Sequence, residues 1–554
     1  MLNCKQCKAS FEVTDQNRKF YEMVSPEFNG KKYLISDPTL CLDCRAQRRL
    51  AYRNERSLYH RKSDMSGKQI VTMYPPEAPY KVFAKEEWWG DMWDPRNFGR
   101  EFDFSRSFFD QFAELMKEVP LPPLVVGDGE NADYTNYTMS CRNSYLIDSS
   151  DYDEDCYYGS YLFKCQDCID CLFVSDSTHL YECIDCKGCA NSQFLQNCYN
   201  CSDCLFCYNL RNCQDCIGCV NLRGKKNCLF NEQLTKEEFA KKKKELKLAA
   251  SNLKFIRDKF LSVKKKYPHK FTEIEDCINS TGDHLIRCKN CHNCFDLVEA
   301  EDCTNVSLGL KPKDCMDCAG VPNSEICYET VASPEDYAMR FCAVTWPRSD
   351  FLYYCLFCRM SKNCFGCVST LKNEYCILNR QYIKEEYEKF VPQIIEHMKK
   401  TGEWGEFFPI NLSPFAYNET VAQDYFPMEK EDVIKGGWKW HEENQAKSYK
   451  GPVYEVPDKI EDVADDITKQ ILICEATGKP YKMIPQELKF YREHGIPVPR
   501  QCPDERHRAR MNLRNPRKLY DRKCDKCGAV IRTTYSPDRP EKVYCEKCYL
   551  EEVY

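Results

Sequence analysis

The chain has 554 residues, a net charge of −6 and 40 cysteines. This length supports several domains with their own cores, so no covalent or metal staple is needed merely for folding. The nearly balanced charge excludes a molecule that binds nucleic acid through its overall field, so any basic surface has to be local.

The opening residues, Met1-Leu2-Asn3-Cys4-Lys5, lack the apolar stretch of a signal peptide, and no window reaches the length of a membrane span. We therefore expect a cytoplasmic protein without membrane contact. In a reducing compartment clustered cysteines are metal ligands or free thiols.

Six segments predict an α+β multidomain protein with a cysteine-rich, β-solenoid-like middle and helices, flanked by duplicated zinc-ribbon units. The expected boundaries are 1–90 for the first ribbon unit, 91–135 for an aromatic connector with a helix, 136–270 and 271–402 for two cysteine-rich blocks that each end in a helix, 403–470 for an aromatic, then acidic connector, and 471–554 for the second ribbon unit.

The two ends are copies of one another, because residues 41–89 align with 502–550 at a constant offset of 461. Each copy has kept a different set of four cysteines: Cys4, Cys7, Cys41 and Cys44 in the first, and Cys524, Cys527, Cys545 and Cys548 in the second. The first copy has Ser63, Ser66, Ala84 and Glu87 where its second set would be, and the second copy has Thr477 and Glu505 in its first set. Cysteines that are lost together served one ion together.

Paired Cys-x-x-Cys knuckles predict a structural zinc ion at each complete set, because four thiolates leave no open coordination position. We expect no zinc at the set that contains Thr477 and Glu505. The knuckles of the last site are expected on either side of a hairpin formed by 529–534 and 542–544.

The connector and the middle carry further local signals. An amphipathic helix is expected over 105–117, before Pro120. Cysteine triplets beginning at Cys165, Cys183 and Cys201 recur at a constant offset of 18, which indicates a solenoid with one coil per period.

A degenerate second block covers Cys277 to Cys376, and both blocks run into helices. The first helix begins at a capping box, Thr235 with Glu238, and is expected to present one side made of Leu246, Ala249, Leu253, Ile256 and Phe260. The second is expected to be interrupted by Pro392 and to end at Gly402.

The middle cysteines allow two interpretations. They can be small apolar fillers of a narrow interior ladder, which we favour, or facing thiols that bind zinc or an iron–sulfur cluster. The run Cys198, Cys201, Cys204 and Cys207 loosely resembles a cluster motif, but lacks the trailing Cys-Pro.

Arginines recur with a spacing of four residues beside the first set in each copy, as Arg45, Arg49 and Arg53 and as Arg506, Arg510 and Arg514. This spacing places each trio on one face of a helix. Such a face can bind phosphates of a nucleic acid, or it can be a solvated or ion-paired helix face; both interpretations stay open.

Two stretches resemble known zinc-ribbon families of short bacterial domains: Cys4 to Arg45, with Phe11, Phe20-Tyr21 and Pro38, and Cys524 to Tyr549, with Gly528 and Pro540. Taken whole, the chain resembles a cysteine-rich bacterial family of small-genome, candidate-phylum bacteria that carries both ribbon types. The resemblance implies zinc and a cytoplasmic setting, and it implies no activity.

The sequence contains no Gly-rich phosphate loop, nucleophile elbow or H-E-x-x-H motif. It therefore favours a non-enzymatic, zinc-binding scaffold or binding protein that docks RNA or a ribonucleoprotein through the arginine faces. The alternatives are a metal-storage or redox protein that uses the middle cysteines, and a thiol enzyme.

Overall fold

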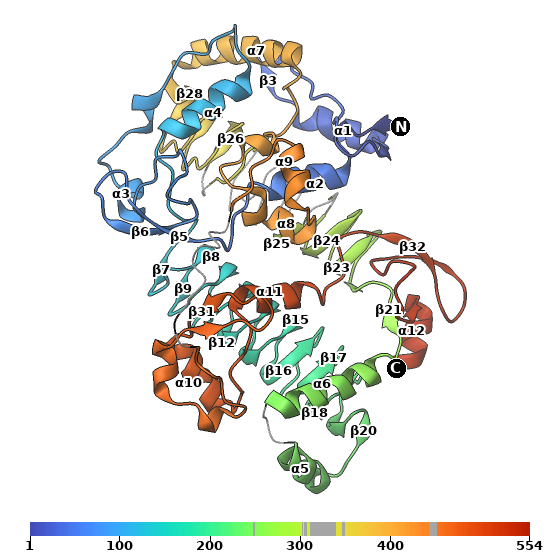
Figure 1. Cartoon of the computed structure of the whole chain (residues 1–554). Helices are drawn as coiled ribbons and strands as arrows, with labels where there is room; N and C mark the ends of the chain where they lie inside the picture. The colour runs from blue at the N-terminus through green and yellow to red at the C-terminus, as the bar shows by residue number, and fades with distance from the viewer. Residues whose placement is uncertain are drawn as a thin grey trace. The chain divides into compact units, whose positions relative to one another are not determined.

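The computed structural model describes residues 1–246, 250–301, 303, 307–310, 339–345, 349–442, 451 and 453–554 (Figure 1). The described part of the chain mixes helices with many short strands, as the α+β class requires. It divides into two compact units: 1–124 with 272–441 and 516–519, and 125–271 with 442–515 and 520–554. The first ribbon copy thus shares a unit with the second cysteine-rich block, and nearly all of the second copy shares a unit with the first block.

Both ribbon copies share the order of two strands, two helices, two strands and a helix, to which the first copy adds a strand pair between its first two helices and the second copy adds a strand before its last helix. In the first copy the elements are β1 (Leu2–Asn3), β2 (Ser10–Phe11), α1 (Asp15–Val24), β3 (Glu27–Phe28), β4 (Lys31–Lys32), α2 (Leu42–Leu50), β5 (Tyr59–Lys62), β6 (Gln69–Thr72) and α3 (Lys85–Trp89). In the second copy they are β30 (Leu472–Ile473), β31 (Pro480–Tyr481), α10 (Pro485–Glu493), α11 (Pro503–Met511), β32 (Tyr520–Lys523), β33 (Val530–Thr533), β34 (Val543–Tyr544) and α12 (Glu546–Val553).

The hairpin of the last ribbon site differs from the prediction. Strand β33 pairs antiparallel with β32, and not with the strand at 542–544. Strand β34 instead pairs in parallel with β21 (His269–Lys270), and the amide of His269 donates to the carbonyl of Lys542 at 2.7 Å. The predicted hairpin is wrong because a segment remote in sequence takes its place.

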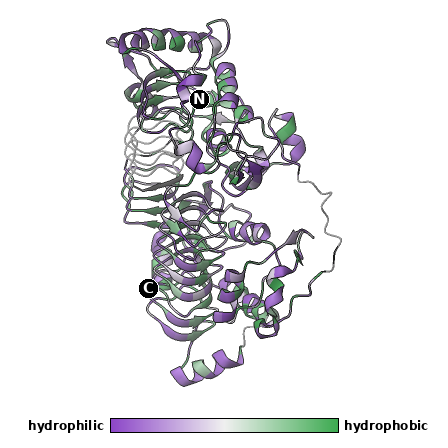
Figure 2. Cartoon of the chain, turned by 90° about the vertical axis from the view of Figure 1, so that its left-hand side faces the viewer, coloured by the Kyte–Doolittle hydropathy of each residue, from purple (hydrophilic) through white to green (hydrophobic). Residues whose placement is uncertain are grey.

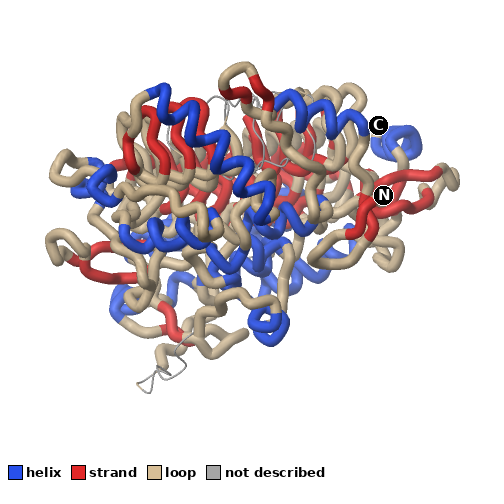
Figure 3. Tube along the Cα trace, turned by 90° about the horizontal axis from the view of Figure 1, so that it is seen from above, coloured by secondary structure: helices blue, strands red, loops and turns tan. Residues whose placement is uncertain are grey.

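The first cysteine-rich block forms a parallel ladder, which we call the first ladder (residues 136–233). Neighbouring strands pair at a register offset of 12, as Leu172 with Ile184 and Gln214 with Lys226. The strands stack rung upon rung (Figure 3). The parallel strands are β8 (Asn136–Met139), β10 (Asp148–Asp151), β11 (Ser160–Phe163), β12 (Gln166–Ile169), β13 (Leu172–Ser175), β14 (Thr178–Tyr181), β15 (Ile184–Lys187), β16 (Ala190–Gln196), β17 (Leu205–Tyr208), β18 (Gln214–Ile217) and β19 (Lys226–Leu229). The last strand, β20 (Glu232–Gln233), pairs antiparallel with β19.

The cysteine triplets recur every 18 residues in the sequence, but neighbouring strands are 12 residues apart, so the expected coil of 18 residues is wrong. Every third residue points inward, so both the sequence offset of 18 and the register offset of 12 are whole numbers of triplets. An offset of 18 is one and a half times the register offset. Cys165, Cys168 and Cys171 are all 2 % exposed or less. The residue before each inward position has a left-handed backbone, such as Asp167 with φ 50° and Asp170 with φ 54°. Asn, Asp and Gly tolerate this conformation best, which is why they so often precede the inward cysteines.

The second block forms a similar ladder, the second ladder, over the described residues of 274–381. Its strands are β22 (Ile274–Glu275), β23 (Gly282–Ile286), β24 (Cys294–Val298), β25 (Ser307–Leu310), β26 (Asp350–Tyr353), β27 (Lys362–Phe365), β28 (Glu374–Ile377) and β29 (Arg380–Gln381). The same register offset of 12 pairs Leu285 with Leu297 and Cys364 with Cys376. Its cysteines 315, 318 and 327 lie outside the described residues.

Helices follow both ladders. The capping box at Thr235 is confirmed, and α5 (Lys236–Glu245) and α6 (Ala250–Lys264) follow it as two helices. Ile256, Phe260 and Val263 of α6 are buried, whereas Ala249 lies outside the described residues. Helix α7 (Lys384–Thr401) continues through Pro392, so the predicted interruption is wrong, and it ends at Gly402 with φ 75° as predicted.

Both connectors are divided between the units: 91–124 and 403–441 belong to the first unit, and 125–135 and 442–470 to the second. Helix α4 (Phe108–Glu118) is capped by Ser107, close to the predicted bounds of 105–117. Residues of the aromatic segment after 402 form short helices, including α8 (Val421–Tyr425) and α9 (Lys430–Lys435). Phe407 and Phe408 contact Tyr52 at centroid distances of 5.5 and 5.9 Å, which anchors this segment beside α2.

Candidate metal centres and arginine helices

The first candidate metal centre joins a turn and a helix start. Cys4 and Cys7 lie in the turn between β1 and β2, while Cys41 caps α2 and Cys44 lies in its first turn. One ligand atom from each of the four residues lies within 4.8 Å of all the others. The Sγ atoms of Cys7 and Cys41 are 3.6 Å apart.

The second candidate centre has the same construction. Cys524 and Cys527 lie in the turn between β32 and β33, Cys545 caps α12 and Cys548 lies in its first turn. Their Sγ atoms also lie within 4.8 Å of one another, and those of Cys527 and Cys545 are 3.8 Å apart. Four thiolates at 2.3 Å from one tetrahedral zinc ion are about 3.8 Å apart, so both donor sets fit zinc.

Hydrogen bonds within each set lower the pKa of one of its thiols. Although desolvation opposes the shift, backbone N–H groups of Cys545, Cys527 and Lys526 lower the pKa of Cys524 to about 6. In the other centre, a hydrogen bond from the thiol of Cys44 lowers the pKa of Cys41 to about 5. The thiolate is the metal-binding form of cysteine, so a lowered thiol pKa favours the binding of a metal cation.

The lost site of the first copy is filled by a hydrogen-bond network. The Ser63 hydroxyl donates to the Glu87 carboxylate, which also accepts from the Ala84 amide at 2.9 Å. Ser63 Oγ accepts from the amides of Met65 and Ala84 at 3.2 and 3.4 Å. The second contact repeats one in the metal centre, where the amide of Cys545 donates to Cys524 Sγ at 3.3 Å. A polar network has replaced the ion on the same backbone.

The lost site of the second copy retains two thiols, Cys474 and Cys502, which are 1 and 4 % exposed. Thr477 Oγ1 accepts from the Lys479 amide at 3.3 Å, and Glu505 forms an ion pair with Arg508. Among the described residues, the two complete tetrads are the groups that bring three or more ligand atoms within 4.8 Å. Sequence comparison of the copies distinguishes these two sets from the broken ones.

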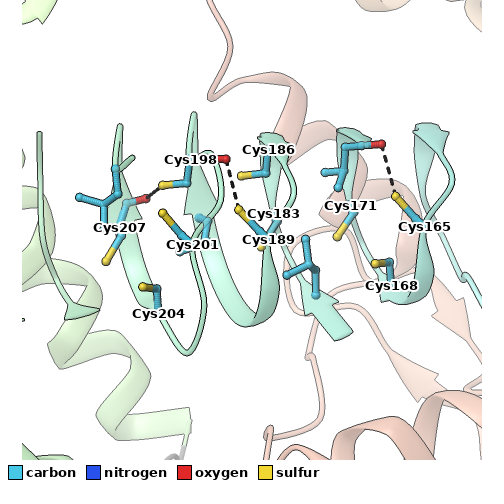
Figure 4. Close-up of a cluster of buried hydrophobic side chains, with 14 of the residues drawn as sticks. Cys165, Cys168, Cys171, Cys183, Cys186, Cys189, Cys198, Cys201, Cys204 and Cys207 are labelled. Carbon is cyan, nitrogen blue, oxygen red and sulfur yellow. Dashed lines mark hydrogen bonds between the residues drawn. The ribbon is translucent and has the colours of Figure 1, made fainter. Parts of the chain in front are cut away.

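The ladder thiols are buried donors (Figure 4). Cys165 donates to the carbonyl of Val174 at 3.4 Å, Cys189 to that of Cys198 at 3.3 Å, and Cys198 to that of Cys207 at 3.7 Å. Desolvation raises the pKa of Cys141 to about 12 and that of Cys156 to about 11. Other ladder thiols have a lowered pKa, because hydrogen bonds from neighbouring thiols, first that of Cys207, lower the pKa of Cys204 to about 5 and that of Cys219 to about 4. Donation to carbonyls favours the packed-ladder interpretation over metal binding for Cys165, Cys189 and Cys198.

The arginines of the second copy contact acidic residues of the first ladder. Arg506 and Arg510 contact Asp170 at 3.2 and 2.9 Å, and Arg510 also contacts Glu182 at 3.2 Å. Both acidic partners lie at left-handed bends of the ladder, as does Asp185.

Arg514 continues the row and contacts Asp185 at 3.0 Å. The three arginine side chains are only 3, 1 and 6 % exposed in chain order. They clamp α11 and the residues that follow it to the ladder. Arg510 and Asp170 are 340 positions apart in the chain, and Arg514 and Asp185 are 329 apart. This separation is why the sequence did not reveal the role.

The arginines of the first copy are buried too. Arg45, Arg49 and Arg53 are 3, 1 and 4 % exposed, and Arg53 forms an ion pair with Glu55 at 2.5 Å. Arg45 donates to the hydroxyl of Tyr21 at 3.3 Å. Arg53 lies beyond the end of α2 and Arg514 beyond the end of α11, so the prediction that each trio lies on one helix face is wrong for its third member. The ion pairs of Arg506, Arg510 and Arg514, and that of Arg53, favour the ion-paired interpretation. Phosphate binding by these six residues stays a prediction that requires them to leave buried positions.

No protein-family model matches this chain, and no curated protein is similar to it at a significant level. The bacterial family suggested by the ribbon motifs therefore stays a hypothesis, whereas the two tetrads stand on their geometry. Within the described residues, none of the helices has an apolar stretch of membrane-spanning length.

Proposed function

We propose that this protein is a non-enzymatic scaffold that holds two structural zinc ions and presents its ladders as a rigid surface to a partner. The observation that carries the proposal is the pair of closed four-cysteine sets, one in each ribbon copy. A set of four thiolates leaves no position for a substrate or for water, so the ion supplies folding energy rather than chemistry.

We infer that each ladder is a β-solenoid whose coil length equals the register offset of 12. The offset of 12 between all parallel strand pairs of the first ladder supports the fold, and so do its left-handed residues at every third position. In the second ladder most strand pairs keep the offset of 12, while Ile274 pairs with Leu285 at 11 and Arg340 with Tyr353 at 13. Four triplets per coil supply four bends, and thiols are small enough to line the narrow interior. Such a stack is stiff, because each coil is hydrogen-bonded to both of its neighbours.

The arginine rows serve assembly in this proposal. The contacts of Arg510 with Asp170 and Glu182 support a role in seating the second ribbon copy on the first ladder. This role explains why the arginines persist in both copies while the zinc ligands diverge. An RNA or ribonucleoprotein partner then has to be bound by other side chains.

Metal analysis of protein purified without oxygen and without an affinity-tag metal tests the proposal. Two zinc ions and no iron per chain are expected. Cys4→Ser with Cys7→Ser, and Cys545→Ser with Cys548→Ser, should each remove one ion and leave the other. Many zinc ions, or iron with cluster absorbance, would overturn the proposal in favour of metal storage or redox chemistry in the ladders.

A further inference from the structure

Residues 236–270, which follow the first ladder, concentrate positive charge in a chain whose net charge is −6. They include thirteen Lys and Arg against four Asp and Glu, a net charge of +9. The equivalent residues after the second ladder, 384–418, have four Lys and Arg against six Asp and Glu, a net charge of −2. The two segments are duplicated endings, so the positive charge belongs to one copy alone.

Most lysines of α5 and α6 are exposed, whereas Lys264 is partly buried and donates to Gln196, and Lys270 contacts Glu546 at 3.0 Å. Lys243 contacts Asp215 at 3.5 Å. Five further exposed lysines have no carboxylate of the described residues within 4.0 Å, the distance limit of an ion pair: Lys241, Lys242, Lys244, Lys254 and Lys259. Four consecutive lysines, 241–244, surround most of α5, because successive side chains are about 100° apart. A bound anion would relieve the repulsion among them.

The apolar sides of both helices are already used. Phe239 of α5 and Ile256, Phe260 and Val263 of α6 are buried in one cluster with Phe206 of the first ladder. What remains outside is mostly polar, and α5, the lowest helix in Figure 1, is drawn mostly in the hydrophilic colour in Figure 2. A helix that lies in a lipid surface needs a free apolar face, which this pair lacks.

Two large apolar side chains of α6 are exposed, Phe255 by 56 % and Leu261 by 41 %. They are six positions apart and so point about 120° away from each other, which makes no apolar stripe. Phe255 lies one turn before Lys259, on the same side of the helix. An exposed ring beside a cation is the combination that stacks an unpaired base and neutralises its phosphate.

We propose that α5 and α6 form a docking surface for single-stranded RNA, bound through its phosphates by the lysines and through a stacked base by Phe255. The proposal rests on the scaffold function above and names the partner of that scaffold. Recognition through phosphates and stacking is independent of sequence and depends strongly on salt.

Fluorescence anisotropy with a fluorescein-labelled 20-nucleotide oligouridine tests the surface. The full-length variant K241E/K242E/K244E should bind at least about tenfold more weakly than wild type at low salt, and its salt slope should fall by about 2, since each contact contributes about 0.7. The matched control is K384E/K389E/K400E on α7, which makes the same change in charge on the copy without the excess of lysines. Its affinity should stay within about twofold of wild type.

A second set of variants, on α6, tests the surface even if the α5 substitutions unfold that helix. K254E/K259E should also weaken binding, and F255A should weaken it while leaving the salt slope unchanged. Equal losses in the α7 control, no oligouridine binding, or binding to phosphatidylserine vesicles alone would each overturn the proposal. Zinc content is counted on the same preparations, so a failure of the scaffold proposal, seen as altered metal content, is distinguished from a failure of this surface.

Discussion

The two ribbon copies began as one unit and now solve the same structural problem in opposite ways. Where the second copy holds Cys524, Cys527, Cys545 and Cys548, the first copy holds a network centred on Ser63 and Glu87. The arginine rows, in contrast, stay buried in both copies. In the proposed function, the difference teaches that a metal ion in a small module can be exchanged for hydrogen bonds. Buried arginines, which in the second copy pair with acidic residues of the first ladder, are harder to exchange.

The largest effect is expected from breaking a metal centre. Cys548→Ser should remove one zinc ion and unfold the surrounding ribbon, because binding energy in such sites is folding energy of about 10 kcal/mol or more. Cys44→Ser should do the same to the other ribbon. Hydrogen exchange should show the loss within residues 520–554 for the first variant and within 1–50 for the second. Global unfolding by both variants would contradict the independence of the two centres.

The reverse exchange should also work. Replacing the network by S63C/S66C/A84C/E87C restores the ancestral set on a backbone that matches a working centre. We expect three zinc ions per chain, by elemental analysis, and a higher melting temperature in zinc than in chelator. The control is S63C/S66C alone, which should bind no third ion tightly. A content of two zinc ions in the fourfold variant would show that the backbone has diverged too far.

The clamp is the next test. Arg510→Met should destabilise the protein by about 3–5 kcal/mol, because Asp170 and Glu182 lose a buried cationic partner. Arg508→Met on the same helix is the control: its side chain is 62 % exposed, and we expect a change of less than about 0.5 kcal/mol. Chemical denaturation measures both values. Recovery of stability when Asp170→Asn is added to Arg510→Met would confirm that unpaired charge is the cause.

The smallest effect per residue is a loss of stability at alkaline pH. Burial raises the pKa of Cys141 to about 12 and of Cys156 to about 11, above the unfolded value of about 8.5. The folded state therefore binds more protons above pH 8.5, and stability falls as pH rises. Between pH 7.5 and 9 we expect about 0.8 kcal/mol for each such thiol. Denaturation at the two pH values in reductant measures it, and unchanged stability would contradict protonated ladder thiols.

Local chemistry made part of this structure predictable from sequence. The tetrads follow from spacing and from the pattern of loss between the copies, and the capping box at Thr235 follows from four consecutive residues. The triplet repeat of the ladders could also have been predicted, since Asp, Asn or Gly often precedes the cysteines. The offset of 12 could not, because offsets of 12 and 18 are both whole numbers of triplets.

Other features depend on distant partners and could not be predicted. Arg510 and Asp170 are separated by 340 residues, so nothing near either residue indicates an ion pair. The same holds for β34, whose partner β21 belongs to the segment after the first ladder. A basic helix face has the same sequence pattern whether it meets solvent, phosphate or a buried carboxylate.

Each unit combines segments that are far apart in the chain, which has a consequence for folding during synthesis. The first unit is complete only when the chain from 272 to 441, and then residues 516–519, have followed residues 1–124. At about 5–20 residues per second, the first ribbon waits on the order of 20–80 s after it leaves the ribosome. In the proposed function, a zinc ion bound by Cys4, Cys7, Cys41 and Cys44 holds the nascent ribbon in shape until then. This gives the earliest-made copy a reason to retain its first set of cysteines.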